Sequence, residues 1–416
     1  MKKIKVVYLV NFDLGLKIHI RNFLRYQQEQ GYEVSVVCHP GRWLTHDRYV
    51  PLGDTTIHDD TGTSPCGIFV KIIPFKPSID PLGDLKTLIQ LVDYFRREKF
   101  DIVHTSTVKP GLLGRLAARI TGTPVVVHTV RGLYLHEQMS PWQYRFFVLI
   151  EKLGAACCHA ILSQNKEDIE TAIREGICPP AKISHLGNGI DLSQFDPDRI
   201  RPEEVKALRE QLGISPQQPV VGTVARLVRE KGIYEFLEAA YLLKSKGVKA
   251  RYLVVGSSQK DKTSAVSPEG HARRYGLEDE VMFLGHRDDI PHLLSLMDVV
   301  VLASYAEGIP RILMESAALG KPVVASRVRG TVEVVVEGKT GLLAPVRDGP
   351  ALAEGILAIL NNPERAAEMG RQARQHALTH FDERLYFWKT DAEYRRLLRA
   401  RLAMDPDAIL KPIPAA

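Results

Sequence analysis

Long apolar runs, paired cysteines and glycine-rich loops are scarce in this sequence of 416 residues. No uninterrupted apolar stretch reaches about 18 residues, so no membrane-spanning helix is predicted. The apolar run at residues 6–10 is too short for a signal peptide and predicts a buried strand. The cysteines are Cys38, Cys66, Cys157, Cys158 and Cys178. Their odd number and spacing suit neither a zinc site nor a disulfide framework, so we expect reduced thiols in the cytoplasm.

The charge balance excludes few functional classes, but it gives no support to nucleic-acid binding. The chain has 55 Lys and Arg residues against 49 Asp and Glu, a formal net charge of +6. So small an excess does not indicate a nucleic-acid-binding protein, whereas it is compatible with phosphate groups or an acidic lipid surface. Apolar residues make up 45% and charged residues 25%, as in ordinary globular domains.

The length and the order of apolar segments predict two domains. A chain this long exceeds the size at which one hydrophobic core stops growing. Short apolar runs alternate with longer amphipathic segments, and the alternation restarts after a charged stretch with several prolines. This alternation is typical of parallel β/α units. We expect a first domain at 1–190, a linker at 191–219, a second domain at 220–380 and a tail at 381–416.

The expected fold class is therefore α/β, with two Rossmann-like doubly wound domains. Ligands of such sheets bind beyond the carboxyl ends of the strands, so two domains that face each other would enclose the site in a cleft. Residues 351–404 are expected to be helical throughout. The aromatic part of this tail suits either a cap on the second domain or a return to the first.

The segment from Ser304 to Glu315, directly after the apolar run at 299–302, has the clearest chemistry. Pro310 suits a first helical position, so free N–H groups and the positive end of the helix dipole would bind a diphosphate. The residues of this phosphate site are Gly308, Ile309, Pro310, Arg311 and Ile312. Glu315 can accept hydrogen bonds from both hydroxyls of a ribose, and Glu307 lies nearer a sugar beyond the phosphates. By spacing alone, an N-cap glutamate followed by an exposed helix glutamate fits equally well.

A second cluster, from Arg226 to Gly232, follows the first strand of the second half. Arginine binds phosphate oxygens through two parallel hydrogen bonds, and lysine supplies a point charge. Arg226 and Lys231 would thus neutralise a departing diphosphate without a metal ion. A solvated basic loop is the alternative, and the expected position on the same sheet edge as the two glutamates weakens it.

Together these motifs resemble family 4 glycosyltransferases, which are retaining enzymes of the GT-B fold. The segments that carry the similarity are Arg226 with Lys231, Glu307 with Glu315, and residues 188–195, 281–291, 320–326 and 330–342. Residues 104–114 are similar to a bacterial surface-polysaccharide branch. The resemblance implies a hexosyl- or N-acetylhexosaminyl-transferase that uses a nucleotide diphosphate sugar, expected to be a UDP-sugar.

The resemblance also implies roles in the second half. Backbone groups around His286 and Arg287 would contact the base, and Glu315 the ribose. Arg226 and Lys231 would neutralise the diphosphate. Glu307 would contact the transferred sugar, beside the backbone of residues 308–311.

In the first half, His128 matches the family's histidine that meets the donor sugar near the reacting carbon. Family members commonly have a Gly-Gly pair after the first strand, whereas this chain has only Gly15. Lys17 would replace part of the lost phosphate contact. Lys109 is also assigned to the donor.

The expected reaction is retaining transfer, without metal or other cofactor, to a sugar, a lipid-linked glycan or a small-molecule acceptor. Asp196 and Asp198 match the Asp-x-Asp sequence that binds a metal ion in other glycosyltransferases, but they lie in the charged linker, so we expect a turn. A nucleotide-sugar epimerase of the same fold and a catalytically silent binding protein remain alternatives.

Residues 142–150, with Arg131 and Lys152, mix aromatic, aliphatic and basic side chains. Such a helix is expected either to rest on the inner face of the cell membrane or to pack as an ordinary helix of the first domain.

Overall fold

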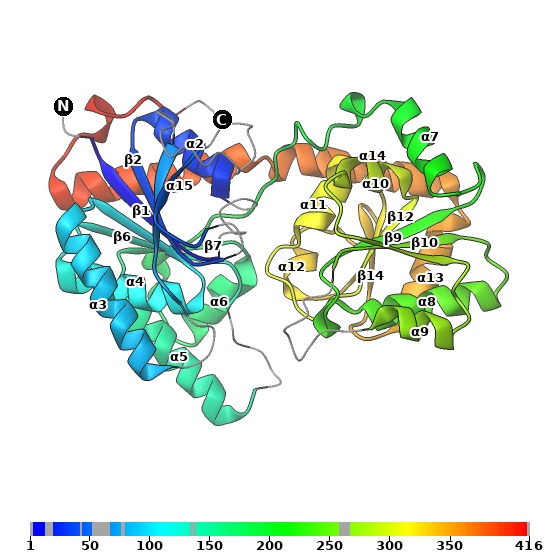
Figure 1. Cartoon of the computed structure of the whole chain (residues 1–416), viewed down its shortest axis with the longest axis horizontal. Helices are drawn as coiled ribbons and strands as arrows, with labels where there is room; N and C mark the ends of the chain where they lie inside the picture. Colours follow the sequence, from blue (N-terminus) through cyan, green and yellow to red (C-terminus); the bar gives the residue numbers. More distant parts are fainter. Residues whose placement is uncertain are drawn as a thin grey trace. The chain divides into compact units, whose positions relative to one another are not determined.

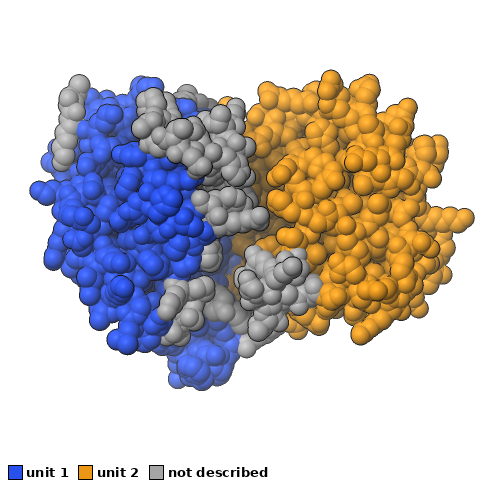
Figure 2. Space-filling view, in the orientation of Figure 1, with its two compact units in different colours: residues 1–187, 386–416 blue, residues 188–385 orange. Residues whose placement is uncertain are grey.

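The computed structural model describes residues 3–12, 20–41, 44–51, 67–75, 80–133, 135, 139–257 and 267–413. The chain divides into two units, which Figure 2 colours separately. The first unit combines residues 1–187 with 386–416, and the second unit spans 188–385. Each has a central sheet with helices on both faces (Figure 1).

The described sheet of the first unit has eight strands in the order β3-β4-β2-β1-β5-β6-β7-β8. All neighbours are parallel except β3, which is antiparallel to β4. The strands are β1 Lys5–Phe12, β2 Glu33–His39, β3 Arg48–Pro51, β4 Gly67–Ile72, β5 Ile102–Ser106, β6 Val125–Val130, β7 Ala160–Ser163 and β8 Ile183–His185. The short apolar runs at 6–10, 34–38, 102–104, 125–128 and 160–163 predict β1, β2, β5, β6 and β7, whereas the other three strands were not predicted.

Helices cover both faces of this sheet, and successive side chains of each strand point to opposite faces, so both sets of side chains are buried. Val7 and Leu9 of β1 join the core formed with α3, α4 and α5, whereas Val6 and Tyr8 join the core formed with α2 and α15. The helices of this unit are α2 Arg21–Gln30, α3 Pro81–Glu98, α4 Val108–Thr121, α5 Pro141–Ala156, α6 Lys166–Arg174 and α15 Glu383–Leu402, with the 3-10 helices η2 Pro180–Lys182 and η5 Pro406–Ala408.

The described sheet of the second unit is fully parallel, in the order β11-β10-β9-β12-β13-β14. Its strands are β9 Val220–Val224, β10 Arg251–Val255, β11 Val281–Gly285, β12 Val299–Leu302, β13 Val323–Ser326 and β14 Gly341–Ala344. Its helices are α7 Pro202–Gln211, α8 Ile233–Ser245, α9 Pro268–Arg274, α10 Ile290–Leu296, α11 Arg311–Ala318, α12 Arg329–Val332, α13 Gly349–Leu360 and α14 Pro363–His380, with η3 Pro197–Arg199 and η4 Arg229–Lys231.

Two details differ from the sequence-based expectations. Residues 191–219 are not a bare linker, because Leu208 of α7 is buried in the core of the second unit with Leu293 of α10. Residues 351–404, expected to be helical throughout, are divided among three helices, α13, α14 and α15. The chain breaks before Pro363, where the side chain of Asn362 accepts the backbone N–H of Arg365 and caps α14.

The last helix, α15, packs on the first unit. Tyr386 and Tyr394 are buried in the same core as Phe23 of α2. The hydroxyl of Tyr394 contacts the hydroxyl of Tyr8 and Nδ1 of His104, which lies on β5. The sequence left open whether the aromatic part of the tail caps the second domain or packs on the first. In the structure it packs on the first unit.

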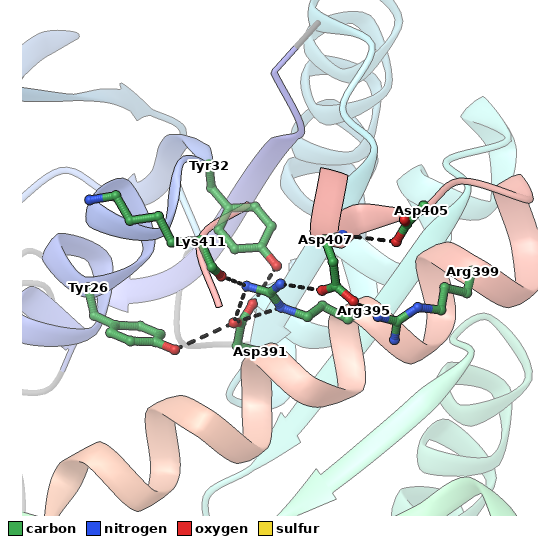
Figure 3. A network of polar contacts seen from close by, with 8 residues as sticks. All are labelled: Tyr26, Tyr32, Asp391, Arg395, Arg399, Asp405, Asp407 and Lys411. Atoms are coloured by element: carbon green, nitrogen blue, oxygen red, sulfur yellow. Dashed lines mark hydrogen bonds and ion pairs between the residues drawn. The ribbon is translucent and has the colours of Figure 1, made fainter. Parts of the chain in front are cut away.

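A buried ion pair secures this return (Figure 3). Asp391 has no exposed side-chain surface and accepts hydrogen bonds from Tyr32 and, at 3.1 and 3.0 Å, from Arg395. Arg395 also donates to Asp407 and to the carbonyl of Lys411, both at 2.6 Å. The polar groups of α15 are thus satisfied within the first unit, as buried charges require.

Candidate active site

Two loops of the second unit meet at the carboxyl ends of the neighbouring strands β9 and β12. Gly232, before α8, has a φ of 65°, and a Cβ atom there would lie 2.0 Å from the carbonyl oxygen of Ala303. Tyr305 donates its backbone N–H to the carbonyl of Glu230 at 2.8 Å. Only glycine fits at position 232, and the close backbone packing fixes the loops against each other.

A salt bridge joins the same two loops. Nζ of Lys231 lies 2.6 Å from Oε1 of Glu307, and both side chains are mostly buried. Water screens a partly buried pair less than a surface pair, so each side chain holds the other in place. The sequence predicted both residues in the site, and the structure brings them together.

The start of α11 presents backbone donors. The helix begins at Arg311, one residue later than expected, and Pro310 is its N-cap. A Cβ atom at Gly330 would lie 2.0 Å from the carbonyl oxygen of Gly308, so the start of α12 holds this loop in place. Among the described residues, none accepts the backbone N–H groups of Gly308, Ile309, Arg311 and Ile312. Such free N–H groups at a helix start suit a phosphate.

Glu315 projects from the second turn of α11 and is mostly buried. Its Oε1 lies 3.4 Å from Nε of Arg311, whose Nη1 in turn lies 3.4 Å from the carbonyl oxygen of Gly189. Burial raises the pKa of Glu315, and the Arg311 guanidinium opposes that shift. A ligand that donates hydrogen bonds to this carboxylate would therefore offset its desolvation.

Arg226 is the more exposed cation of the cluster. Its Nη2 lies 3.2 Å from Oε1 of Glu230, and both side chains are about half exposed. Exposed pairs of this kind contribute little to stability. The guanidinium can therefore exchange Glu230 for a phosphate oxygen at small cost.

His286 and Arg287 follow β11, as predicted, but their side chains are engaged elsewhere. Arg287 donates to both carboxylate oxygens of Asp289, at 2.8 and 2.6 Å, and this contact lowers the pKa of Asp289. His286 is exposed, with Nε2 3.6 Å from Asp288. The contact between the backbone here and a base stays a prediction.

Tyr305, within the predicted motif, is a site residue that the sequence did not single out. Its hydroxyl donates to Oε1 of Glu235 at 2.6 Å, and the guanidinium of Arg347 lies 4.6 Å from its ring centroid. Burial, followed by the bond to Glu235, raises the pKa of Tyr305 to about 12. These contacts hold the loop that contains Glu307. The position of Tyr305 between Ser304 and Glu307 was the available signal.

His128 does not lie at a strand end. Strand β6 continues to Val130, and the His128 side chain is 4% exposed. Its Nδ1 lies 2.9 Å from Oγ1 of Thr105, and a Cβ atom at Gly111 would lie 2.7 Å from its Cε1. Burial, then the nearby Arg115, lowers the pKa of His128, so the imidazole is neutral. Its contact with a donor stays a prediction.

Of the remaining predicted residues of the first unit, the structure describes Lys109. Nζ of Lys109 lies 2.8 and 2.9 Å from the two carboxylate oxygens of Asp84, at the start of α3. The lysine predicted to bind the donor is thus engaged in an ion pair within its own unit. Gly15 and Lys17 lie outside the described residues.

Over the described ranges, no group of three or more His, Cys, Asp or Glu side chains is arranged to bind a metal ion. Asp196 instead caps η3 by accepting the N–H of Asp198, and it lies 3.0 Å from Arg374. This is the turn that the sequence predicted for the pair of aspartates.

The chain has two α/β units with mostly parallel sheets, and one unit has a loop suited to an anion beside a buried carboxylate. These features define the general class of nucleotide-binding α/β proteins. Comparison with known proteins narrows this class. Residues 15–189 match the glycosyl transferase 4-like domain, and residues 204–376 match the glycosyl transferases group 1. The chain belongs to this glycosyltransferase family, and it has the GT-B fold.

The relatives include two bacterial enzymes. The chain is 31% identical over 287 residues, 68% of its length and 73% of the relative's, to the UDP-Gal:alpha-D-GlcNAc-diphosphoundecaprenol alpha-1,3-galactosyltransferase of Escherichia coli. It is 27% identical over 405 residues, 96% of its length and 99% of the relative's, to the capsular polysaccharide biosynthesis glycosyltransferase CapM of Staphylococcus aureus.

Solved structures share the fold. A glycosyltransferase from Rickettsia africae has a TM-score of 0.77 and 19% identity, over 96% of this chain and all of the other. HepE of Anabaena in complex with UDP and glucose has a TM-score of 0.76 and 21% identity, over 94% and 99% of the two chains.

Proposed function

We propose that this glycosyltransferase moves a sugar from a UDP-sugar to an acceptor hydroxyl, with retention of configuration and without a metal ion. One observation supports the proposal above all: Lys231 paired with Glu307, the free N–H groups at the start of α11, and Glu315 converge at one edge of the second sheet. Each suits a different part of a nucleotide sugar.

The nucleotide would be held by Glu315 and by backbone groups. The Glu315 carboxylate is desolvated, and Arg311 is its one charged partner in the part of the chain that the structure describes, so two ribose hydroxyls can donate to its oxygens. The backbone at His286 and Arg287 would read the base. Charged hydrogen bonds of this kind contribute about 1.5–3 kcal/mol each.

The diphosphate would lie against the N–H groups of Gly308, Ile309, Arg311 and Ile312, at the positive end of α11. Lys231 and Arg226 would supply the rest of the positive charge. Because the negative charge on the leaving group grows as the bond to the sugar breaks, fixed donors here stabilise the transition state more than the ground state.

In the transfer step, the bond between the sugar's anomeric carbon and the diphosphate oxygen breaks. The bond from the acceptor oxygen forms on the same face, and the acceptor proton passes to an oxygen of the leaving diphosphate. Glu307 would accept hydrogen bonds from hydroxyls of the transferred sugar, and Lys231 holds it in position. His128 would contribute as a neutral imidazole.

The acceptor would be a glycan linked to a lipid diphosphate, and the enzyme would work in the cytoplasm at the inner face of the membrane. The names of two relatives, from Escherichia coli and Campylobacter jejuni, include a diphosphoundecaprenol or diphospho-undecaprenol acceptor. HepE has been solved with UDP-glucose, which supports uridine as the base.

A thermal-shift panel of free nucleotides and nucleotide sugars tests the donor. A ligand at a hundred times its Kd adds about 2.7 kcal/mol to stability. UDP and one or more UDP-sugars should raise the Tm of the wild type, and Glu315→Ala, with an affinity about tenfold lower, should lose about half of the stabilisation at the same ligand concentration. No shift with any uridine nucleotide, or an equal shift in the variant, would contradict the proposal.

The two alternatives predict different products. An epimerase would convert a nucleotide sugar into its isomer without releasing nucleotide, whereas a silent binding protein would release none even with acceptor extracts. The relatives named above are glycosyltransferases, which supports transfer over both. Release of UDP on addition of a lipid-linked acceptor separates the three.

A further inference from the structure

Helix α5 of the first unit exposes an apolar stripe. Trp142, Phe146, Leu149 and Leu153 are 69%, 42%, 64% and 50% exposed. Their spacing of four, three and four residues places all four on one face of a 16-residue helix. A continuous exposed stripe of large apolar side chains is uncommon on a protein surface that contacts only water.

The charges beside this stripe are positive. Arg145 and Lys152 are exposed, and among the described residues no carboxylate lies within ion-pair distance of either. The acidic residue of α5, Glu151, points inward instead, where its Oε2 lies 3.4 Å from Nη2 of the fully buried Arg115. Helix α5 therefore presents apolar and cationic groups outward, but no anionic group.

A hollow adjoins the stripe. Its volume is about 340 Å³, and its walls are Tyr144, Arg145, Val148, Leu149, Lys152 and Glu175. Both outward cations of α5 thus border this cavity and offer positive charge to a phosphate-bearing headgroup, next to apolar side chains that suit acyl chains. The carboxylate in its wall, Glu175, lies 3.4 Å from Nε of Arg174.

Helix α3 offers an internal comparison. It also exposes apolar side chains, including Leu85 and Ile89, which are 54% and 61% exposed. Its exposed charges, however, have both signs, and Asp93 pairs with Arg97 at 2.8 Å. Of these two helices, it is therefore α5 that has charge complementarity to an anionic surface.

We propose that α5 docks the enzyme onto an anionic lipid bilayer, with the stripe in the interface and Arg145 and Lys152 on phosphate headgroups. The proposal rests on the lipid-linked acceptor proposed above, because docking would bring that acceptor to the enzyme. The contact is peripheral: within the described residues, every helix is too short or too polar to cross a membrane.

Flotation with vesicles tests the proposal. The full chain should float with vesicles of phosphatidylglycerol and phosphatidylcholine at low salt, and much less with phosphatidylcholine alone. Leu149→Ser with Leu153→Ser should weaken vesicle binding at least about tenfold. The matched control, Leu85→Ser with Ile89→Ser on α3, should leave it unchanged. Arg145→Glu with Lys152→Glu should abolish the preference for the anionic lipid, whereas Lys246→Glu with Lys249→Glu in the second unit should not.

Three outcomes would overturn the proposal: a wild type that does not float, α5 variants that float as well as the wild type, or α3 variants that are equally impaired. A second copy of the chain as the occupant would appear as a concentration-dependent dimer that the α5 variants abolish. UDP-induced thermal shifts report on the donor site alone, so unchanged shifts with lost flotation, or the reverse, separate failure of this proposal from failure of the proposed function.

Discussion

The two units use the polar residues of their strands and the adjoining loops differently. In the second unit, the polar side chains of Lys231, Glu307 and Glu315 gather around backbone N–H groups that have no acceptor among the described residues. In the first unit, His104 and His128 are buried within the sheet, and their described partners belong to the same unit.

This difference distinguishes a site whose polar groups suit a ligand from a polar core whose groups are paired with one another. The carboxylate of Glu315 gains from a new donor because burial raises its pKa. The ion pair of Asp391 and Arg395 gains nothing, since both groups are saturated by Tyr32, Asp407 and each other. The same residue types therefore stabilise the fold in one unit and suit ligand binding in the other.

The largest expected effect breaks the polar core of the first unit. Arg395→Met leaves Asp391 buried without its counter-charge, which should lower the free energy of unfolding by about 3–5 kcal/mol in urea titrations. Arg396→Met removes a pair with Glu393 in which the arginine is 59% exposed, and it should cost at most about 1 kcal/mol. Equal effects of the two changes would mean that α15 is not held by the buried pair.

The next effect concerns the sugar. Glu307→Gln should reduce turnover about a hundredfold, the effect of losing one transition-state contact, while UDP affinity stays within about twofold. The amide can still accept from Lys231, so the loop should keep its position. Initial rates and calorimetry measure the two quantities, with the exposed Glu354→Gln as control. Equal loss of UDP affinity and turnover would show that Glu307 contacts the nucleotide instead.

Much of this contrast could be predicted from the sequence, for a physical reason. The site of the second unit lies in two short loops after adjacent parallel strands, so residues such as Lys231 and Glu307 meet through local geometry. The fate of His128 and Lys109 depends on partners distant in sequence, Thr105 and Asp84, which no local pattern reveals. The helix breaks in the tail were missed for a simpler reason, since apolar periodicity outweighed the Asn-Pro signal before α14.

Acid should destabilise the first unit through His104. Burial lowers its pKa to about 3, from an ordinary value of 6.5. Below pH 6.5 the unfolded chain therefore binds a proton that the folded chain does not, and stability is lost as pH falls toward 3. The loss from this group between pH 7.5 and pH 5 should be about 2 kcal/mol. Urea unfolding of His104→Gln should show a shallower pH dependence than the wild type, whereas the exposed His46→Gln should not.

A smaller effect is expected at the ribose contact. Glu315→Ala removes a charged acceptor, so the affinities for UDP and for the intact donor should both fall about tenfold. Glu354→Ala, an exposed helix residue of the same unit, should change neither. If the variant bound UDP normally but lost only the sugar nucleotide, the carboxylate would have to contact the sugar rather than the ribose.

The smallest expected effect is none: chelator should leave turnover unchanged. A diphosphate leaving group needs about two positive charges nearby, which a divalent cation supplies in many enzymes. Here Lys231, the exposed Arg226 and the N–H groups at the start of α11 lie around one sheet edge and offer comparable charge once Arg226 exchanges Glu230 for a phosphate oxygen. Rates should therefore be equal with EDTA and with added magnesium or manganese. If EDTA abolished turnover and metal restored it, these groups would not supply enough positive charge for the diphosphate. A metal ligand from outside the described residues would then have to complete the site. Arg226→Ala sharpens the test, because lost turnover that magnesium does not rescue would place the missing charge on the arginine itself.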